Sequence, residues 1–590
     1  MTQHDYLAIS QLLNDNLLDE ARELLDISLK KDPSNSQLLV LTKKYSQLSG
    51  NLQYAAAVFK NAIALNEMCI DANLYLSQTL LQLNKPQETI KYCSLLLCIN
   101  SNNIDAHITI GKAYLHIDQL DSALRHLQRA EKAQPEDAAT QQLLGIILRK
   151  KRDFLGAYKH LQKALKLQPD NATLYNITGL TLHNLGKANK AVDCFEAGLK
   201  LFPSDVNILT NCGFALRNMG NFTKAEKFFR NAIKYDVKCC AAYSGLANIK
   251  KYKTDDSQDI IAMQDLLADK RLSNNNISML NFALGKAYDD CKKYDAAFEH
   301  YTIANRLNST QNPYDAKGET IWHRELIKQF NADYFITQPQ LPITQQKRVI
   351  FIVGFYRSGT TMLEQILLSH SKVTGKGETP FLTQALAMTA QLNRENLPYP
   401  QGIKNLKQTE LKKIADEYRK NIEADIDTNV ELIIDKQLIN YQHLGIVSQL
   451  FPDAMIIHCK RHPIDTCLSV FFHSFDKNIT FAHELKNIGH YYLHYKKTME
   501  HWRKVLPTPI YESSYESLVA QPDNKIPALF DFLGLEWESA ALKFYKQKEK
   551  AVQTASAWQV RQPIYKKSVA RWHNYAQQLE DLRKQLGVDN

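Results

Sequence analysis

The sequence has 590 residues, of which 44% are apolar and 23% are charged, and its formal net charge is +10. This length and composition are typical of a globular protein with two or more domains. No apolar run approaches the ~18–20 residues that a membrane span requires, and the N-terminus has no basic block followed by an apolar one. We therefore expect a cytoplasmic protein without a signal peptide or a membrane anchor.

The positive charge is concentrated in residues 151–253, which hold 17 Lys and Arg against 7 Asp and Glu. A basic surface of this kind attracts acidic partners, so an acidic peptide or protein is the expected ligand, and no nucleic acid is expected. A solvated helix face would account for the same residues equally well.

Small and turn-forming residues recur every 34 positions in the first half of the chain. Prolines occupy equivalent places at 33, 135, 169 and 203, where they end one helix and begin the next. Three columns of small residues share this period, and they include Gly111, Gly145, Gly179 and Gly213; Ala123, Ala157, Ala191 and Ala225; and Ala130, Ala164, Gly198 and Ala232. The pattern predicts antiparallel helices in close contact.

This array resembles the tetratricopeptide repeat, which implies an α solenoid with a concave surface for a peptide or a protein partner. We expect seven to nine helical hairpins over residues 1–310, with a partly polar insertion at about 255–276. A dimerisation or spacer arm is the alternative role. Residues 311–346 lack the repeat pattern, and we expect a linker helix there, near 321–332.

A second domain is expected over residues 347–590, and it begins with RVIFIVGFYRSGTTMLEQILLSH. A buried strand, Arg348–Val353, precedes a glycine-bearing loop and a helix, which is the arrangement that binds phosphate through backbone N–H groups. The spacing of Gly354 and Gly359 matches the nucleotide-triphosphatase loop, but Thr360 replaces its lysine. The absence of lysine argues against a kinase or an ATPase, and Arg357 offers a two-pronged contact to an oxyanion instead.

The loop GFYRSGTT resembles the 5′-phosphosulfate loop of sulfotransferases that use 3′-phosphoadenosine 5′-phosphosulfate (PAPS). The resemblance implies an α/β domain with a central parallel sheet, and it implies that the loop residues bind the 5′-phosphosulfate: Arg357, Ser358, Gly359, Thr360 and Thr361. A second signature supports it. Arg461 follows a predicted strand at 454–459, and Ser469 stands eight residues later, as do the two residues that hold the 3′-phosphate in this family.

Two further residues resemble catalytic groups of the tyrosylprotein sulfotransferases. Glu378 lies 21 residues after Arg357 and resembles their catalytic base, and a base of this kind accepts the proton of a phenol. A helix-capping role is the alternative for Glu378. Lys436 follows a predicted strand at 431–434, and the resemblance places it against the leaving oxygen.

Two positions depart from the pattern of that branch. Pro380 stands where the family has a basic residue that touches the substrate, and His473 stands where animal enzymes have an arginine on the 3′-phosphate. Additional contacts to PAPS are expected from Tyr515 and from a late loop at 553–565, through Thr554, Ser556 and Gln562.

No metal is expected, because the sequence shows no cluster of ligands; His490 and His494 lack the glutamate of HExxH and are interpreted as packing or surface residues.

The sequence therefore predicts a sulfotransferase that moves a sulfuryl group from PAPS to a hydroxyl, most favourably that of a protein tyrosine. A carbohydrate or a small phenol stays open as the acceptor. A sulfotransferase fold that serves only as a scaffold, with the repeats as the interaction module, is the alternative.

Overall fold

The computed structural model describes residues 3–310, 313–338, 340–343, 347–475, 478–546, 559–565 and 567–588. The chain forms two compact units, Met1–Asn211 and Cys212–Asn590. Within the parts of the chain that the structure describes, none of the helices combines the length and the apolar character that a membrane span requires.

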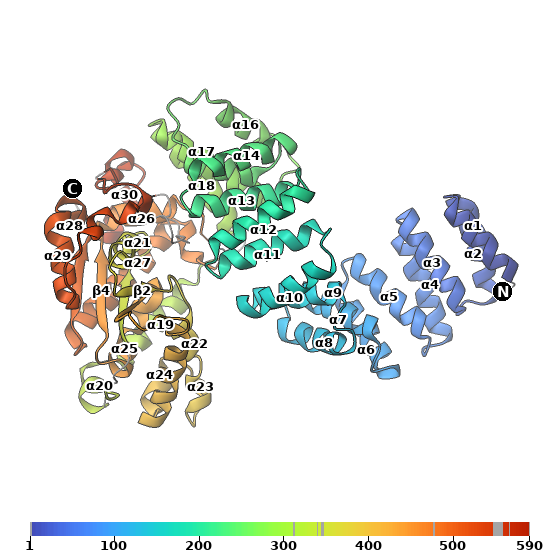
Figure 1. Cartoon of the computed structure of the whole chain (residues 1–590), viewed down its shortest axis with the longest axis horizontal. Coiled ribbons are helices and arrows are strands. Elements are labelled where there is room, and N and C mark those ends of the chain that lie inside the picture. Colours follow the sequence, from blue (N-terminus) through green and yellow to red (C-terminus); the bar gives the residue numbers. More distant parts are fainter. Residues whose placement is uncertain are drawn as a thin grey trace. The chain divides into compact units, whose positions relative to one another are not determined.

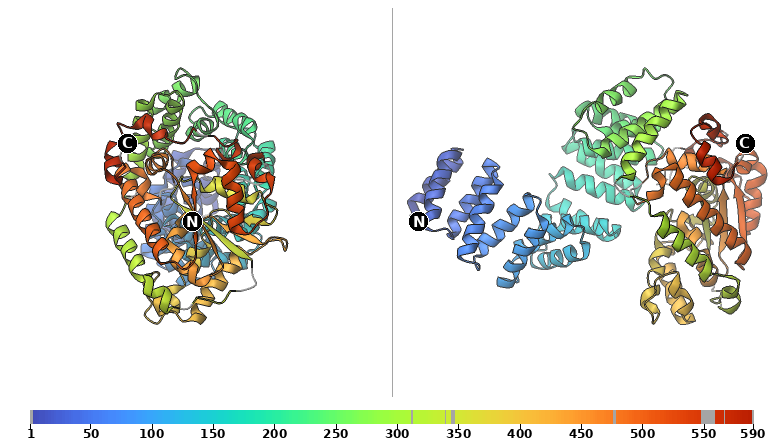
Figure 2. Two further views of the ribbon diagram at one scale, coloured as in Figure 1. Left: turned by 90° about the vertical axis from the view of Figure 1, so that its left-hand side faces the viewer. Right: turned by 180° about the vertical axis from the view of Figure 1, so that it is seen from behind.

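The first unit is a stack of antiparallel helix pairs, as the repeat period predicts (Figures 1 and 2). Its helices are α1 (Gln3–Asn14), α2 (Leu18–Lys31), α3 (Ser36–Ser49), α4 (Leu52–Leu65), α5 (Ile70–Gln82), α6 (Pro86–Ile99), α7 (Ile104–His116), α8 (Leu120–Ala133), α9 (Ala138–Lys150), α10 (Phe154–Leu167), α11 (Ala172–Asn184) and α12 (Ala188–Leu201). Helix α13 (Val206–Asn218) continues the series into the second unit.

The small residues of each repeat allow the two helices of a pair to touch. A Cβ atom placed on Gly145 would lie 2.5 Å from Leu161 Cγ, and one on Gly179 would lie 2.4 Å from Phe195 Cε1. In both pairs the large partner stands 16 residues after the glycine, on the next helix. The columns therefore exist because the following helix fills the space that a side chain would need.

The second unit opens with the last repeats. They comprise the end of α13 and the helices α14 (Phe222–Tyr235), α15 (Cys240–Ile249), α16 (Gln258–Leu267), α17 (Asn274–Asp290) and α18 (Tyr294–Ser309). The insertion expected at 255–276 contains α16, and Asp259 at its start accepts from Arg230 Nη1 at 2.5 Å and from Lys250 Nζ at 2.8 Å. These ion pairs connect the insertion to α14 and to the residue that follows α15.

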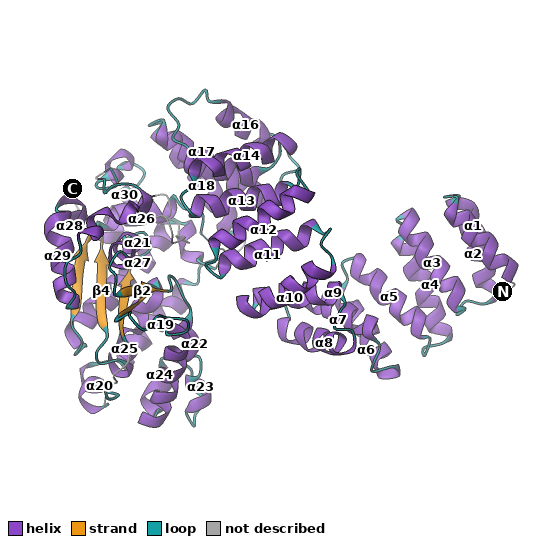
Figure 3. Cartoon of the chain, in the orientation of Figure 1, coloured by secondary structure: helices purple, strands orange, loops and turns teal. Residues whose placement is uncertain are grey.

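A five-stranded parallel sheet forms the centre of the second half of the unit (Figure 3), with the strand order β2-β3-β1-β4-β5. Its strands are β1 (Arg348–Gly354), β2 (Val373–Gly375), β3 (Leu432–Asp435), β4 (Met455–Lys460) and β5 (Ile510–Ser514). The register pairs Ile350 of β1 with Ile434 of β3 and with Met455 of β4. From β1 the chain passes to β2 at one edge of the sheet and then to β3, which lies between β2 and β1. The connection after β3 crosses to β4, on the opposite side of β1. The carboxyl ends of β1, β3 and β4 therefore border a topological switch point, where α/β proteins bind ligands.

Helices cover both faces of this sheet, so β1 is buried on both. Val349, Phe351 and Val353 belong to one apolar cluster, and Ile350 and Ile352 belong to the other, as the alternation of side chains along a strand requires. The helices of this region are α21 (Thr360–Leu368), α22 (Phe381–Leu386), α23 (Thr389–Leu392), α24 (Gln408–Ile422), α25 (Leu444–Leu450), α26 (Pro463–Phe471), α27 (Leu485–Val505), α28 (Tyr515–Ala520), α29 (Pro522–Leu533) and α30 (Glu580–Leu586). Short 3₁₀ helices are η1 (Gln401–Asn405), η2 (Leu438–His443), η3 (Thr480–His483), η4 (Ser539–Lys546), η5 (Gln559–Arg561) and η6 (Arg571–Tyr575).

The stretch expected as a linker forms two helices, α19 (Ala316–Gln329) and α20 (Ala332–Thr337). Leu326 and Phe330 are fully buried in the same cluster as the sheet residues, and the Tyr334 hydroxyl donates to Gln449. Residues 313–338 thus pack as part of the α/β region. The division into domains at 311–346 stays a prediction.

The last repeat packs directly against the α/β region. Asn305 of α18 donates through Nδ2 to the carbonyl oxygen of Phe471 at 2.7 Å, at the end of α26. The rings of Tyr301 and Phe472 stack with centroids 4.0 Å apart. Arg571 forms an ion pair of 2.7 Å with Asp289 of α17. The helix that bears Ser469 is therefore fixed from the repeat side.

Substitution of Gly179 by leucine should lower the thermal stability of the array, because Phe195 occupies the space that the new side chain needs. Overpacking of this kind costs ~1–3 kcal/mol or more. Circular dichroism melting of the full chain measures it. Asn184→Leu is the matched control, since it adds the same side chain at an exposed position of the same helix. Equal melting of the two variants would contradict the packing.

Candidate active site

The loop between β1 and α21 is shaped by two residues in the left-handed backbone region. Arg357 has φ +67° and Gly359 has φ +100°. Glycine adopts such angles freely, but arginine does so at an energetic cost that folded proteins tend to accept at ligand sites. The predicted strand at 348–353 and the predicted helix after the loop are both present, as β1 and α21.

Arg357 is partly buried. Its Nε donates to Ser469 Oγ at 3.1 Å, so the loop arginine and the α26 serine are in direct contact. Burial, together with the nearby charge of Arg461, lowers the pKa of Arg357 to about 10. A buried guanidinium beside a second one calls for an anion between them.

Arg461 holds two segments of the site together. Its Nη1 donates to the carbonyl oxygen of Arg357 at 3.1 Å, and its Nη2 donates to that of Ser568 at 2.6 Å. The guanidinium also lies 5.1 Å above the centre of the Tyr515 ring. A Cβ atom on Gly359 would lie 2.7 Å from Tyr515 Cδ2, so only glycine fits between the loop and this ring.

Two polar atoms at this place have no partner among the described residues. The hydroxyl of Ser358 and the Nε of Arg461 are both buried without a hydrogen bond. Buried donors of this kind are normally satisfied, and leaving them unpaired costs free energy. Ser358 lies in the loop after β1, and Arg461 follows β4. Both atoms can donate a hydrogen bond to an oxyanion.

Glu378, Lys436 and Glu364 form a second group beside the loop. Lys436 is completely buried just after β3, and its Nζ lies 2.6 Å from Glu378 Oε1 and 3.5 Å from Glu364 Oε2. Burial lowers the pKa of Lys436, but the two carboxylates outweigh it, and the net shift is upward. Lys436 is therefore a fixed positive charge at the carboxyl end of the sheet.

The side chain of Glu378 is 40% exposed, so it can meet a substrate while its carboxylate contacts Lys436. No side chain caps the following helix, α22, whose N-cap is Pro380. Glu378 therefore does not serve as the helix cap that was the alternative for it.

Asp435 precedes Lys436 in the chain, and its side chain is fully buried. It accepts from the Tyr418 hydroxyl at 2.9 Å, from Asn440 Nδ2 at 3.0 Å and from the Gln437 amide at 3.2 Å. Burial nevertheless raises the pKa of Asp435 to about 7, because it outweighs the three donors. These contacts fix the backbone on either side of Lys436.

The late-loop residues are only partly within the described structure. Thr554 and Ser556 lie outside the described residues, and Gln562 is half-buried. Tyr565, three residues after Gln562, raises the pKa of Arg357, whereas burial and Arg461 lower it. The contacts of Thr554, Ser556 and Gln562 with PAPS stay predictions.

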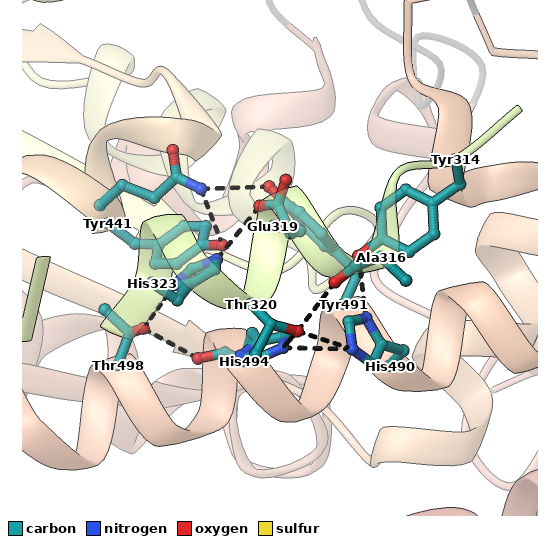
Figure 4. Close-up of polar contacts among 11 residues, drawn as sticks. Tyr314, Ala316, Glu319, Thr320, His323, Tyr441, His490, Tyr491, His494 and Thr498 are labelled. Carbon is teal, nitrogen blue, oxygen red and sulfur yellow. Dashed lines mark hydrogen bonds and ion pairs between the residues drawn. The ribbon is translucent and has the colours of Figure 1, made fainter. Parts of the chain in front are cut away.

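A polar cluster joins α19 to α27 (Figure 4). His323 contacts Thr498 Oγ1 at 3.0 Å and Glu319 Oε1 at 3.2 Å, and Thr320 Oγ1 lies 3.2 Å from His490 Nε2 and 3.1 Å from His494 Nε2. The two histidines thus contact neighbouring side chains of another helix. Among the described residues, no group of His, Cys, Asp and Glu has an arrangement suited to a metal ion.

Tyr356 is influenced by carboxylates of both this cluster and the Lys436 group. Burial raises the pKa of Tyr356, and the carboxylates of Glu378 and Glu319 add to the rise. Tyr356 also packs edge-to-face against Phe475 and Phe481. Tyr356, Phe475 and Phe481 therefore form an aromatic cluster near Glu378.

Sequence reasoning missed Glu364 and Asp435. A signal for Glu364 was available: it is the single charge in the apolar helix TTMLEQILL, and a charge at such a place requires a partner. No comparable signal marks Asp435, because its burial depends on Tyr418 and Asn440, which only the fold brings to it.

Comparisons with known proteins define the class of protein to which each half of the chain is similar. Residues 349–539 match the model of the sulfotransferase family, and residues 80–147, 143–206 and 206–238 match tetratricopeptide-repeat models. The chain thus carries a sulfotransferase-family domain together with tetratricopeptide repeats. This supports sulfuryl transfer as the general chemistry and protein–protein interaction as the general role of the repeats. The expected α solenoid and parallel α/β domain are confirmed.

Individual relatives are less informative. An uncharacterised protein of Aquifex aeolicus (strain VF5) is 33% identical over 338 residues, which are 56% of this chain and 44% of that protein. The chain thus matches less than half the length of this curated relative. YrrB, described as a TPR protein with an unusual peptide-binding site, is 22% identical over 32% of this chain and 96% of its own, with a TM-score of 0.29. The Cut9–Hcn1 structure is 14% identical over 42% of this chain and 49% of its own, with a TM-score of 0.35.

The burial of Asp435 predicts how the free energy of unfolding depends on pH. Its folded pKa of about 7 lies above the unfolded value near 3.9, so its carboxyl is neutral in both states below pH ~4, and the folded state is penalised as pH rises toward 7. The free energy of unfolding of the wild type, relative to Asp435→Asn, should therefore fall by up to roughly 1.4 kcal/mol per pH unit in that window. Urea unfolding at several pH values measures it.

Asp531→Asn, at an exposed position of α29, is the control for Asp435→Asn. Its stability relative to the wild type should stay nearly constant between pH 4 and 7. If Asp435→Asn behaves like Asp531→Asn, the carboxyl of Asp435 is ionised in the folded state throughout the window.

Proposed function

We propose that this protein is a PAPS-dependent sulfotransferase, with the hydroxyl of a protein tyrosine as the favoured acceptor. The observation that carries the proposal is that Arg357 contacts both Ser469 and Arg461. Ser358 Oγ and Arg461 Nε are buried there without a hydrogen bond among the described residues, and the Lys436–Glu378 pair follows the neighbouring strand. The family match at residues 349–539 supports the same chemistry.

The residues present fit a sulfuryl donor that carries a phosphate at each end. The loop at 357–361 would hold the phosphosulfate, and Arg461 and Ser469 would hold the 3′-phosphate. Tyr515 lies against both Arg461 and Gly359, so it would pack near the adenine. The unpaired atoms of Ser358 and Arg461 would gain an oxyanion partner. Thr554, Ser556 and Gln562 stay proposed contacts.

The catalytic roles follow from charge and exposure. PAPS supplies the sulfuryl group. Glu378, which is partly exposed and is oriented by Lys436, would accept the proton of the acceptor hydroxyl. The ammonium of Lys436 is held in place before any reaction, and a fixed positive charge stabilises negative charge that develops on an oxygen. Arg357 contributes a second fixed positive charge in a buried place, where such charges act more strongly.

The acceptor is proposed to be an acidic tyrosine-containing peptide or protein, recruited by the repeats or through a partner bound to them. The 17 basic against 7 acidic residues at 151–253 support an acidic ligand. Pro380 in place of a basic residue leaves a carbohydrate or a small phenol as an alternative acceptor.

The rival proposal is a sulfotransferase fold without catalysis, in which the repeats act as an interaction module. Titration calorimetry with 3′-phosphoadenosine 5′-phosphate (PAP) and with ATP-Mg separates the classes. Tight binding of PAP and weak binding of ATP-Mg supports the sulfotransferase, whereas binding of neither supports the scaffold.

Replacement of Arg357 by alanine should weaken the binding of PAP by roughly 10- to 100-fold, because it removes a charge-assisted contact worth ~1.5–3 kcal/mol, and by more if the contact is bidentate. Calorimetry of the full chain measures this. Arg348→Ala removes the same charge at the opposite end of β1 and is the matched control. Unchanged PAP affinity in Arg357→Ala would exclude the loop as the nucleotide site.

Replacement of Glu378 by glutamine should leave PAP binding nearly intact and lower turnover by ~10²–10⁴, the usual effect of losing a general base. An acidic tyrosine peptide with radiolabelled PAPS provides the assay. Glu395→Gln, at an exposed position of the same region, should retain full activity. Turnover of Glu378→Gln within a few-fold of the wild type would assign the base to another residue.

A further inference from the structure

Glu364 is the single charged residue of α21, and the proposed function gives it no role. The helix packs through Leu363 and Ile366 into one apolar cluster with Ile350 of β1. The side chain of Glu364 is only 5% exposed, and its Oε2 lies 3.5 Å from Nζ of Lys436. A buried carboxylate is costly unless a partner compensates its charge, so its position opposite a completely buried lysine calls for a reason.

Lys436 contacts two carboxylates that differ in distance and in burial. Its Nζ donates to Glu378 Oε1 at 2.6 Å, and the Glu378 side chain is 40% exposed. Burial lowers the pKa of Lys436, but both carboxylates raise it, and the charge of Glu364 has a larger effect than the charge of Glu378. The buried charge acts more strongly because water is excluded from it. Glu364 is therefore the interior partner of Lys436, and Glu378 is the partner that a substrate can reach.

A third carboxyl, that of Asp435, belongs to the opposite side of the sheet. It accepts from the hydroxyl of Tyr418 on α24, whereas Lys436 contacts Glu364 on α21. Successive residues of an extended chain point to opposite faces, which separates the two neighbours. Burial raises the pKa of Asp435 to about 7, and the charge of Glu364 adds to the rise. Asp435 therefore does not take the place of Glu364 as a partner of Lys436.

The proposed transfer changes the charge of this group. The acceptor oxygen bonds to sulfur, the bond between sulfur and the bridging oxygen breaks with its electron pair left on PAP, and the hydroxyl proton passes to Glu378. Two carboxylates and one ammonium thereby become one of each, because Glu378 turns neutral. Without Glu364, the same step would leave the buried ammonium of Lys436 with neither of the carboxylates that contact it, and an unpaired buried charge is strongly unfavourable.

We propose that Glu364 is a positioning residue that keeps the ammonium of Lys436 charged and in place while Glu378 accepts the proton of the acceptor. This inference rests on the proposed function, under which Glu378 is the base. The role of Glu364 is exerted through Lys436 and requires no contact with the donor or the acceptor. Glu364 is thus the permanent counterion of Lys436, and Glu378 is the one that changes charge in each turnover.

The first experiment needs no substrate and measures the thermal melting of the full chain. Glu364→Gln and Glu378→Gln each leave Lys436 with one carboxylate, so each should lower the melting temperature only slightly. The double variant leaves neither, and it should lose several °C more than the sum of the two single losses. Addition of Lys436→Met to the double variant removes the unpaired cation and should recover most of that loss. Additive losses would show that the two carboxylates do not share Lys436 and would overturn the inference.

The second experiment separates positioning from folding. Glu364→Gln should lower kcat for transfer to an acidic tyrosine peptide by at least ~10-fold, while PAP affinity stays within ~2-fold of the wild type. Glu364→Asp keeps the charge on a shorter side chain, so its kcat should lie between the two. If Glu364→Gln does not fold, Glu364→Asp decides in its place: a reduced kcat at unchanged PAP affinity supports the role, and a wild-type kcat overturns it.

Glu423→Gln is the matched control, since it also removes a carboxylate from a largely buried cation. Glu423 Oε1 lies 2.8 Å from Nη1 of Arg419, which donates to the carbonyl oxygen of Lys347. Lys347 precedes the amino end of β1, opposite to the end that carries the loop. Glu423→Gln should therefore lower the melting temperature and leave kcat unchanged.

The outcomes separate this inference from the proposed function. If the wild type neither binds PAP nor transfers a sulfuryl group, the proposed function is wrong and this inference falls with it. If the wild type is active and Glu364→Gln transfers at the wild-type rate, Glu364 is a counterion for folding alone, and the proposed function is unaffected.

Discussion

The parallel pairing of β1 with β3 on one side and β4 on the other is the constraint on which the site depends. The register brings three strand ends to one edge, and each is followed at once by a charged residue or a loop. Lys436 follows β3, Arg357 lies in the loop after β1, and Arg461 follows β4. A register shift of one residue in β1 would reverse which side chains face each helical layer, so the apolar strands fix the charged groups indirectly.

Charge is arranged in two separate groups around this edge. Arg357 and Arg461 are close to each other, with hydroxyl and carbonyl groups as their direct partners. Lys436 is instead surrounded by two carboxylates. The first group is suited to binding an anion, whereas the second has more negative than positive charge and retains one partly exposed carboxylate side chain. In the proposed function, binding and proton transfer therefore belong to different residues.

Much of this could be predicted from sequence because the signals are local. The 34-residue period specifies which residues must be small, and the strand–loop–helix pattern specifies where Arg357 lies. Arg357 and Arg461 come from two motifs 104 residues apart, and the parallel pairing of β1 with β4 brings the ends of their strands together. The roles assigned to these residues and to Glu378, Lys436 and Tyr515 stay predictions.

Other features depend on tertiary packing and leave no local signal. Asp435 looks like the last residue of a strand, and only its neighbours Tyr418 and Asn440 show that it is buried. Residues 313–338 read as a connection because they lack the repeat pattern, but Phe330 and Leu326 are in the core.

The contacts of the last repeat have a consequence for how such a chain can change during evolution. Repeats in a solenoid interact mainly with their neighbours, so units can be gained or lost where both neighbours are other repeats. Here Asn305 and Asp289 contact the α/β region directly, through the end of α26 and through Arg571. Duplication or deletion at that end would remove a surface complementary to Phe472. Length variation in related chains should therefore accumulate toward the amino-terminal repeats.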